Sequence, residues 1–386
     1  MNDQKGIRRI LRFLSYILVA VIASCVTLFL FADPMDSKIS ELQSLIRRCY
    51  IGEVTDQQLQ DGAAAGMIGA TGDRWSYYIP ASEYDAYMEQ MKNEYVGIGV
   101  TIASQMTDAG FEVLSVEENG GAFEAGIQAG DVICQVEGQD VLTLEADAAK
   151  QLIRGDADTK VALTVLRGGE KLVFDVMRKR IQVVVAKGEL LPEGIGLITI
   201  ENFDERCADE TIAQIETLTQ QGAKALIFDV RFNPGGYKTE LEEILDYLLP
   251  EGPIFRSISY TGEEEVSQSD EACLELPMAV LINADSYSAA EFFAAALSEY
   301  DKAVVVGEAT TGKSYFQNTF RLSDGSAVGL SVGKYCTPKG VSLAEVGGLK
   351  PDVEVLLEEE TLTKLYAGIL AHEEDLQLQA AIRALQ

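Results

Sequence analysis

The sequence predicts an α/β domain with a largely parallel sheet, preceded by a small β-rich module, a helical segment and an N-terminal transmembrane helix. Three observations support this prediction. From residue 194 onward, continuous apolar runs alternate with amphipathic stretches of helical period, as in α/β layers. Residues 94–180 show short alternating strands separated by glycine-containing turns. Residues 13–32 form an uncharged run of 20 residues, about the length that crosses a bilayer core as a helix.

The N-terminus is predicted to be an uncleaved signal anchor. Residues 1–12 hold four basic side chains against one acidic one, and such a flank is typical of the cytoplasmic side of a span. A cleaved secretory signal is one alternative, although the apolar run is long for a signal peptide and lacks a clean A-x-A site. Lipoprotein processing at Cys25 is another, since residues 22–25 resemble a lipobox, but the chain stays apolar to Ala32.

Composition and charge exclude several classes of function. The chain has 31 Lys and Arg against 61 Asp and Glu, a formal charge of −30, which argues against nucleic acid as a partner because such binding needs basic patches. His372 is the single histidine, so neither a Ser-His-Asp triad nor a His-ligated metal is expected. The six cysteines are widely spaced without a C-x-x-C pair, which excludes a zinc ribbon and a dense disulfide framework. We expect no metal and no cofactor.

The first two segments after the membrane run are predicted to differ in secondary structure. Residues 33–93 are mainly helical, with apolar side chains at helical spacing in the first helix: Ile39, Leu42, Leu45 and Ile46. A helix of small residues follows from Asp61, then a loop over residues 71–78 and a further helix. Residues 94–180 are mainly strands, interrupted by one helix over about residues 144–153.

From Gly194 the predicted strands and helices alternate. They are strand 197–200, helix 208–218, strand 225–230, a helix through 241–248, strand 279–283, helix 289–300 and strand 303–307. The Ser-Asp-Gly-Ser run at 323–326 predicts a hairpin turn. The acidic stretch 262–265 predicts a solvated surface loop, and the tail from Glu358 predicts an amphipathic helix.

Two glycine-containing stretches in residues 94–180 indicate a peptide-binding module. Gly97-Ile98-Gly99-Val100 stands at the entrance to a strand, where backbone N–H groups can surround a carboxylate, although these four residues alone also fit a plain turn. Residues 121–138, with glycines at 121, 126, 130 and 138, follow downstream. Together the stretches resemble a PDZ domain. The resemblance implies that Gly97, Ile98 and Gly99 receive a peptide's terminal carboxylate while the peptide adds as a strand along the exposed edge.

A serine at a helix N-terminus is the candidate nucleophile. Residues 285–291 join an apolar strand to the helix that starts near Ala289, and free backbone N–H groups at such an end can stabilise an oxyanion. These residues alone favour helix capping over a nucleophile, because Asp285, Ser286 and Ser288 are all good caps. Without a histidine nearby, acyl transfer needs another base, and lysine can serve when burial lowers its pKa.

A lysine loop follows the next strand. Residues 307–314 spell a P-loop string, which we reject because the segment opens a strand rather than a helix and belongs to a domain predicted to lie outside the cytoplasm. Together with the serine motif, Lys313 and Gln317 resemble the carboxy-terminal processing peptidases. Residues 229–236 upstream and 335–340 and 348–352 downstream resemble the same family, over roughly residues 35–355 in total.

This resemblance implies a peptidase domain with crotonase/ClpP-like α/β layers and an inserted PDZ domain. It implies Ser288 as the nucleophile, Lys313 as the general base and Gln317 as the residue that orients the lysine amine. It further implies an oxyanion hole formed by the backbone N–H groups of Ala289 and of Gly235 or Gly236. The chain departs from the usual family spelling at Tyr287 and Ser314, but neither change removes a catalytic atom, and we expect an active enzyme.

The predicted protein is therefore a membrane-anchored serine endopeptidase that cleaves extracytoplasmic proteins near their C-termini. The predicted parts are a cytoplasmic stub (1–12), a bacterial cytoplasmic-membrane anchor (13–32), a helical segment (33–93), a PDZ domain (94–180) and a peptidase domain with a C-terminal helical tail (181–386). The PDZ domain is expected to bind client C-termini and either deliver them or gate the site. Family likeness leaves open an activating partner protein and a homo-oligomer. A silent binding protein for C-terminal tails is the alternative, and acyl-CoA chemistry is a third hypothesis from fold analogy alone.

Overall fold

The computed structural model describes residues 13–19, 21, 34–103 and 105–386. The chain divides into two compact units, one that ends at Gly72 and one that runs from Asp73 to Gln386. The predicted membrane anchor at 13–32 lies mostly outside the described residues. Within the described ranges, no helix has both the length and the apolar character that a bilayer crossing requires.

Between residues 34 and 72 the first unit contains two helices, α2 (Pro34–Cys49) and α3 (Asp56–Gly69). A capping box starts α3: the Thr55 hydroxyl accepts the backbone N–H of Gln58, and the Gln58 side chain accepts the N–H of Thr55. The prediction of helices is confirmed here. Residues 73–93 are less helical than predicted, because β1 (Tyr77–Ile79) precedes α4 (Tyr84–Met91), and both belong to the second unit.

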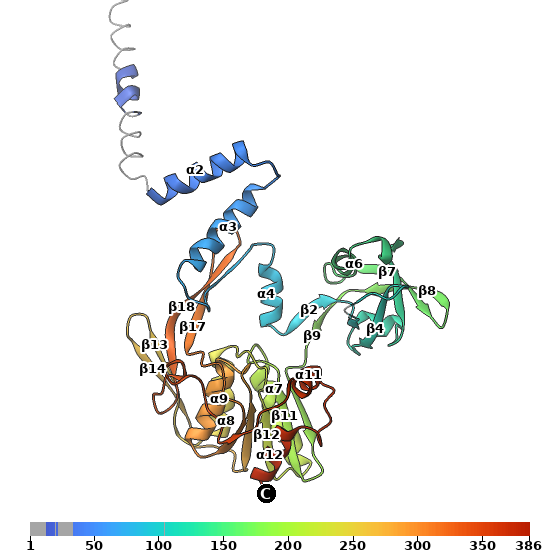
Figure 1. The fold of residues 1–386 in the computed structure, drawn as a ribbon, viewed down its shortest axis with the longest axis vertical. Helices are drawn as coiled ribbons and strands as arrows, with labels where there is room; N and C mark the ends of the chain where they lie inside the picture. Colours follow the sequence, from blue (N-terminus) through green and yellow to red (C-terminus); the bar gives the residue numbers. More distant parts are fainter. Residues whose placement is uncertain (1–12, 20, 22–33, 104) are drawn as a thin grey trace, which may run out of the picture. The chain divides into compact units, whose positions relative to one another are not determined.

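A small β domain is inserted in the second unit, drawn in cyan and green in Figure 1. Its strands follow the order β3-β4-β5-β7-β8, with β6 beside β5. The elements are β3 (Val100–Ile102), β4 (Phe111–Val116), α5 (Gly121–Ala125), β5 (Val132–Val136), β6 (Gln139–Asp140), α6 (Ala146–Ile153), β7 (Lys160–Arg167) and β8 (Glu170–Met177). Phe111, Ile133 and Leu163 are fully buried in its core. β2 (Glu94–Gly97) pairs with β9 (Lys179–Gln182), and we call this two-stranded ribbon the neck.

The six-stranded sheet of the α/β layers is largely parallel, as predicted, with the order β10-β11-β12-β15-β16-β19. Only β10 runs antiparallel to its neighbour among these pairs. The strands are β10 (Ala186–Leu190), β11 (Ile195–Ile200), β12 (Ala225–Asp229), β15 (Met278–Ile282), β16 (Ala303–Gly307) and β19 (Val353–Glu354). Four of them, β11, β12, β15 and β16, agree with the predicted strands because their continuous apolar runs are typical of strands buried on both faces, whereas β10 and β19 were not predicted.

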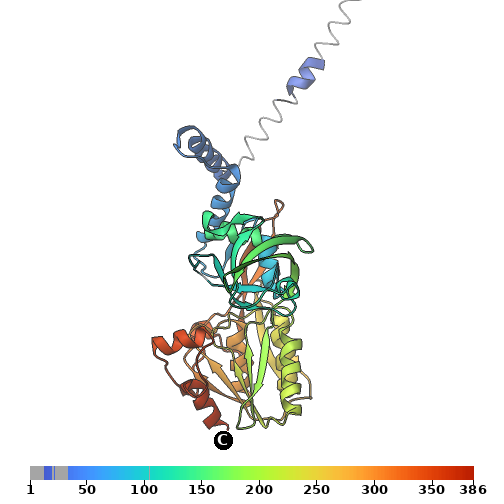
Figure 2. The same ribbon diagram turned by 90° about the vertical axis from the view of Figure 1, so that its right-hand side faces the viewer.

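Helices cover both faces of this sheet. They are α7 (Cys207–Gln220), α8 (Lys238–Leu248) and α9 (Ala289–Glu299) on one face and α12 (Leu376–Ala384) on the other. Ile198 and Phe228 pack in the cluster of the first face, whereas their strand neighbours Leu197 and Ile227 pack with α12. Figure 2 shows α7, in yellow-green, and the red C-terminal helices on opposite sides of the sheet.

A further antiparallel sheet has the order β1-β18-β13-β14, with β17 beside β18. Its remaining strands are β13 (Gly252–Ser259), β14 (Glu264–Ser269), β17 (Tyr315–Arg321) and β18 (Ala327–Cys336). The predicted hairpin at 323–326 is confirmed, since it joins β17 to β18. The predicted loop at 262–265 is wrong for its second half: Glu264 and Glu265 belong to β14 and pair with β13. Backbone pairing holds this edge strand, so its charged side chains can stay exposed.

The C-terminal tail forms two helices rather than the one predicted. After the short α10 (Leu343–Val346), α11 (Glu359–Tyr366) ends before Gly368, whose φ of 67° breaks the helix. Asp375 then caps α12 by accepting the backbone N–H groups of Gln377 and Leu378.

Candidate active site

Ser288 lies at the sharp turn between β15 and α9. It is the N-cap residue of α9, with φ 58° and ψ −126°, a backbone region that residues with a side chain rarely adopt. Ser286 stabilises this turn, because its hydroxyl donates to the backbone carbonyl of Val230 at 2.7 Å and accepts the backbone N–H of Asn283 at 3.0 Å. Strained serines at strand-to-helix turns are typical of nucleophiles.

Glu291, in the first turn of α9, ties this turn to the lysine loop. One carboxylate oxygen accepts the N–H groups of Ser288 at 2.9 Å and Lys313 at 2.8 Å. The other accepts the Gly312 N–H at 2.7 Å and the Thr310 hydroxyl. Burial raises the pKa of the Glu291 carboxyl, while the four donors act in the opposite direction. Glu291 was part of the sequence motif but had no predicted role; the Ser-x-x-Glu spacing of a capping box was the available signal.

Lys313 follows β16 and points its amine at two aromatic rings. The Nζ atom lies 4.7 Å from the centre of the Trp75 ring and 5.7 Å from that of Tyr287. Burial lowers the pKa of the Lys313 amine, and this favours the neutral form that can accept a proton. Within the described residues the amine makes no hydrogen bond to Ser288, although catalytic hydrogen bonds often form only when substrate binds.

Gly235 and Gly236 face the N-terminus of α9. A Cβ atom at Gly235 would lie 2.7 Å from the Cβ of Ser288, and one at Gly236 would lie 2.2 Å from the carbonyl carbon of Phe203, so glycine is required at both positions. The N–H of Gly235 already donates to the side chain of Asn233 at 2.8 Å. In the described part of the chain, the N–H groups of Gly236 and Ala289 have no such partner. Gly236 is therefore the better of the two predicted glycine donors.

Gln317 makes no direct contact of the predicted kind with the lysine. Its side-chain amide donates to the Ser331 hydroxyl at 2.9 Å and to the carbonyl of Tyr315 at 3.0 Å. Lys313 lies two residues before the strand 315–321 and Gln317 lies within it, so the two side chains are not stacked as positions four apart are in a helix. The structure thus does not bring Gln317 to the amine of Lys313.

The loop at residues 73–76 is a part of the site that the sequence did not reveal. The Asp73 carboxylate accepts the N–H of Trp75 at 3.0 Å and the hydroxyl of Ser76 at 2.6 Å. Tyr287 packs against Trp75, with ring centres 5.8 Å apart. No local pattern in the sequence signals that this loop meets the lysine loop.

Two buried charged groups support the glycine loop. The Arg231 guanidinium pairs with Asp229 at 2.6 Å and with Asp375 at 2.8 Å, which ties α12 to the chain just before Gly235. Asp204 is also buried next to the glycine loop, since a Cβ atom at Gly236 would lie 2.6 Å from the backbone nitrogen of Asp204.

Asp204 is also unusual in its charge state. Among the described residues its Oδ1 atom has no hydrogen-bond partner. Burial raises the pKa of Asp204 to about 7, and the neighbouring charges of Glu240 and Glu205 act in the same direction. An acid that titrates near neutrality thus adjoins the glycine loop.

The three residues predicted to bind a carboxylate lie at the start of the β domain. Gly97 ends β2, Ile98 is buried in the domain core, and Gly99 has φ 78° with its Cα packed against Gly120. β3 begins at the next residue and stands first in the strand order of its sheet, so it is an edge strand. Their role in binding stays a prediction.

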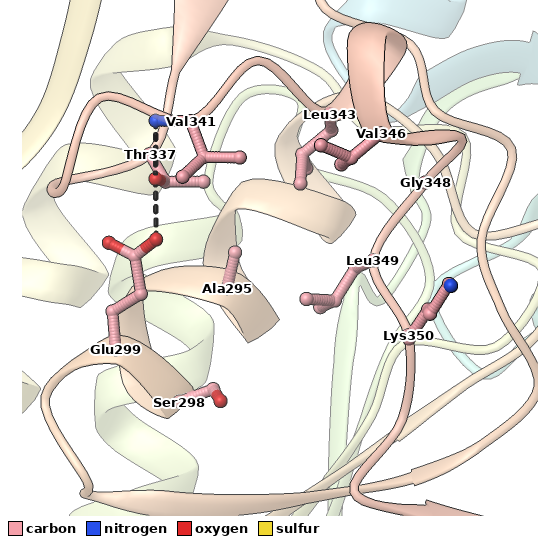
Figure 3. A pocket seen from close by; sticks show the side chains of 10 residues that line it. All are labelled: Ala295, Ser298, Glu299, Thr337, Val341, Leu343, Val346, Gly348, Leu349 and Lys350. Atoms are coloured by element: carbon pink, nitrogen blue, oxygen red, sulfur yellow. Dashed lines mark hydrogen bonds between the residues drawn. The ribbon is translucent and has the colours of Figure 1, made fainter.

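A hollow of about 350 Å³ lies at the far end of α9 rather than at Ser288. Figure 3 shows the Glu299 carboxylate accepting the Thr337 hydroxyl, which in turn accepts the N–H of Val341. These groups satisfy each other, and the opposite wall is formed by apolar side chains such as Leu349. Among the described residues, no group of three or more His, Cys, Asp or Glu side chains is arranged to hold a metal ion.

Comparisons with known proteins agree with this arrangement. The model of peptidase family S41 matches residues 194–355, and that of the PDZ domain matches residues 96–177. The carboxy-terminal processing protease CtpA of Bacillus subtilis is 32% identical over 366 residues, which cover 91% of this chain and 78% of that protein.

More distant matches extend the same pattern. A Staphylococcus epidermidis protein described as a CtpA-like serine protease is 29% identical, with 82% of this chain and 65% of that protein covered. A solved structure described as an S41 protease from Bacteroides fragilis superimposes with a TM-score of 0.54 at 17% identity, covering 86% of this chain and 92% of that one. This likeness concerns the fold alone.

Proposed function

Because the chain belongs to peptidase family S41, together with the carboxy-terminal processing protease CtpA, we propose that it is a serine endopeptidase with Ser288 as nucleophile and Lys313 as general base. The main support is the Glu291 carboxylate, which accepts hydrogen bonds from the backbone of both residues. Because one carboxylate binds the backbone of both residues, it fixes their positions relative to each other, although they come from different loops.

In the proposed reaction the neutral Lys313 amine takes the proton of the Ser288 hydroxyl as its oxygen attacks the peptide carbonyl. The N–H groups of Gly236 and Ala289 stabilise the resulting oxyanion. The lysine ammonium then gives its proton to the leaving amine, and an acyl-enzyme remains. Water hydrolyses this ester by the same sequence, with Lys313 again as base, and releases the new C-terminus.

The proposed substrates are proteins with exposed C-terminal tails. The edge strand β3 supports this, because the open edge of a strand next to Gly97, Ile98 and Gly99 can pair with an extended peptide that ends there. Capture of the tail would hold a client near the peptidase, or would release a site that the empty domain restrains.

We further propose that residues 13–32 anchor the protein in a bacterial cytoplasmic membrane, with both folded domains outside the cytoplasm. The support is the uncharged run of 20 residues behind a basic flank. Replacement of residues 1–33 by a cleavable secretory signal should move the protein from the membrane fraction to the soluble extracytoplasmic fraction. Retention in the membrane fraction would contradict the anchor.

The dyad is tested with full-length protein in detergent and a reporter that carries an unstructured, apolar C-terminal tail. Ser288→Ala and Lys313→Ala should each abolish cleavage. Ser298→Ala, on the same helix, and Lys350→Ala, on the surface, are matched controls that should cleave at the wild-type rate. Cleavage by Ser288→Ala at the wild-type rate would disprove the assignment. Amidation of the reporter's terminal carboxylate tests the tail-binding step, since it should slow cleavage while the reporter's sequence stays the same.

A further inference from the structure

The amine of Lys313 is covered by two aromatic rings. Its Nζ atom lies over the faces of Trp75 and Tyr287, and the two rings are themselves in contact at 5.8 Å with a 35° tilt. Within the described residues, no hydrogen bond or ion pair reaches this amine. Aromatic carbon and nitrogen atoms therefore occupy the volume in which water would otherwise solvate the ammonium group.

The position of Trp75 is fixed by a chain of hydrogen bonds. The Asp73 carboxylate accepts a hydrogen bond from the backbone N–H of Trp75 at 3.0 Å and another from the side chain of Ser331. Ser331 lies in β18, where its hydroxyl accepts the Gln317 amide at 2.9 Å and its backbone N–H donates to Ser76 at 3.1 Å. The ring is thus held against the lysine by strands β17 and β18, and Gln317 is connected to this loop through Ser331.

Rings at this distance have two opposing effects on a lysine. Exclusion of water disfavours the charged ammonium, whereas the negative face of an aromatic ring favours it by about 0.5–2 kcal/mol. The other charged groups that act on the amine are Glu291 from α9 and Asp73 and Arg74 from the loop. The net direction is a lowered pKa of Lys313, with burial as the largest cause, whereas the charges of Glu291 and Asp73 act in the opposite direction.

We propose that Trp75 is a positioning residue for Lys313: its ring, with that of Tyr287, keeps water from the amine and holds it as the free base beside the Ser288 turn. This inference rests on the proposed function for its catalytic consequence. The contact between Trp75 and Lys313 is a separate claim that can be measured without catalysis.

The catalytic consequence is tested by pH profiles of kcat/KM for full-length wild type, Trp75→Ala and Trp75→Leu, with Tyr260→Ala as the exposed aromatic control. Trp75→Ala admits water, so the alkaline-rising midpoint should move up by about one pH unit, with an about tenfold loss at pH 7 that is recovered at high pH. Trp75→Leu keeps the apolar cover without the aromatic face, so its midpoint should stay at or below that of wild type. An unchanged midpoint in Trp75→Ala, or an equal rise in Trp75→Leu, overturns the proposal.

The contact itself is tested by fluorescence, because Trp75 is the chain's single tryptophan. With excitation selective for tryptophan, emission of the wild type should change between pH 6 and 9 with the same midpoint as the activity. In Lys313→Met, which keeps the length of the side chain, this transition should disappear. A transition that persists in Lys313→Met refutes the contact. If Lys313→Ala retains activity while the fluorescence transition depends on Lys313, the assignment of Lys313 as general base is wrong, but the contact between Trp75 and the Lys313 amine is confirmed.

Discussion

Replacing Glu291 with Gln perturbs the carboxylate that joins Ser288, the proposed nucleophile, to Lys313, the proposed base. Each of its two oxygens accepts two donors: one takes the N–H groups of Ser288 and Lys313, the other the N–H of Gly312 and the hydroxyl of Thr310. The amide nitrogen of Gln cannot accept. Whichever way the amide is turned, its NH2 group replaces an oxygen that accepted two donors. Two of the four hydrogen bonds are therefore lost, and those two donors then point at the NH2 group, which is itself a donor.

The size of the effect follows from this count. Hydrogen bonds to a charged group contribute about 1.5–3 kcal/mol each, so two lost bonds correspond to about 3–6 kcal/mol. Relief from burying a charge offsets part of this loss, and we expect a net destabilisation of about 2–4 kcal/mol. Separation of the serine turn from the lysine loop by about 1 Å should lower kcat about 100-fold.

A change in pH dependence gives the variant its signature. The Glu291 charge raises the pKa of Lys313, so its removal should move the activity midpoint to lower pH, opposite to the shift expected for Trp75→Ala. Rates are measured with the tail reporter from pH 6 to 10, and stability by urea unfolding. Glu299→Gln is the matched control on the same helix, where it accepts the Thr337 hydroxyl and the Lys339 N–H. If Glu291→Gln retains the wild-type rate and midpoint, the carboxylate does not hold the dyad together.

Three further predictions concern the glycine loop. Arg231→Ala leaves the buried carboxylate of Asp375 without its cation, so the free energy of unfolding should fall by about 3–5 kcal/mol in urea titrations; a loss below 1 kcal/mol would contradict this. Gly236→Ala puts a Cβ 2.2 Å from the carbonyl carbon of Phe203, so kcat/KM should fall at least about 100-fold, and near-wild-type activity would show that the loop adapts. Because the pKa of Asp204 is raised to about 7, its contribution to stability is full below about pH 4 and is lost as the pH rises through 7. Asp204→Asn lacks this loss and should gain up to about 4 kcal/mol relative to wild type between pH 4 and 8, whereas a constant difference in urea titrations across this range would refute the titration.

The elements of the α/β layers could be predicted because their signals are local. Apolar runs and helical periods predict the strand at 225–230, observed as Ala225–Asp229, and the helix through 241–248, observed as Lys238–Leu248, without knowledge of the rest of the chain. Ser288 and Lys313 could be proposed from a family resemblance. Trp75 could not, because its contact with Lys313 joins segments far apart in the sequence and depends on the packing of β1 against β18.

Gln317 shows a different limit. The family resemblance implied that Gln317 orients the lysine amine, but the backbone there is a strand with an irregular register between Phe316 and Gln317. The side chain consequently reaches Ser331 on β18 instead. The resemblance assigns a role to this position, whereas the contact that the side chain makes depends on the register of β17 against β18, which the sequence alone does not specify.

The two halves of the site are held by different parts of the chain. Glu291 holds the serine and the lysine, whereas the glycine loop pairs with Phe203, which donates its N–H to the carbonyl of Gly235 at 2.8 Å. The segment around Phe203 is in turn bonded to the base of the neck: Asn93 donates to Asn202 at 3.1 Å, and Arg206 donates to the carbonyl of Asn93 at 2.8 Å. A displacement of the neck therefore reaches the glycine loop through these bonds before it reaches the dyad. If the β domain regulates cleavage, it should do so by moving the proposed oxyanion donors, which changes kcat while the pKa of Lys313, the proposed base, stays fixed.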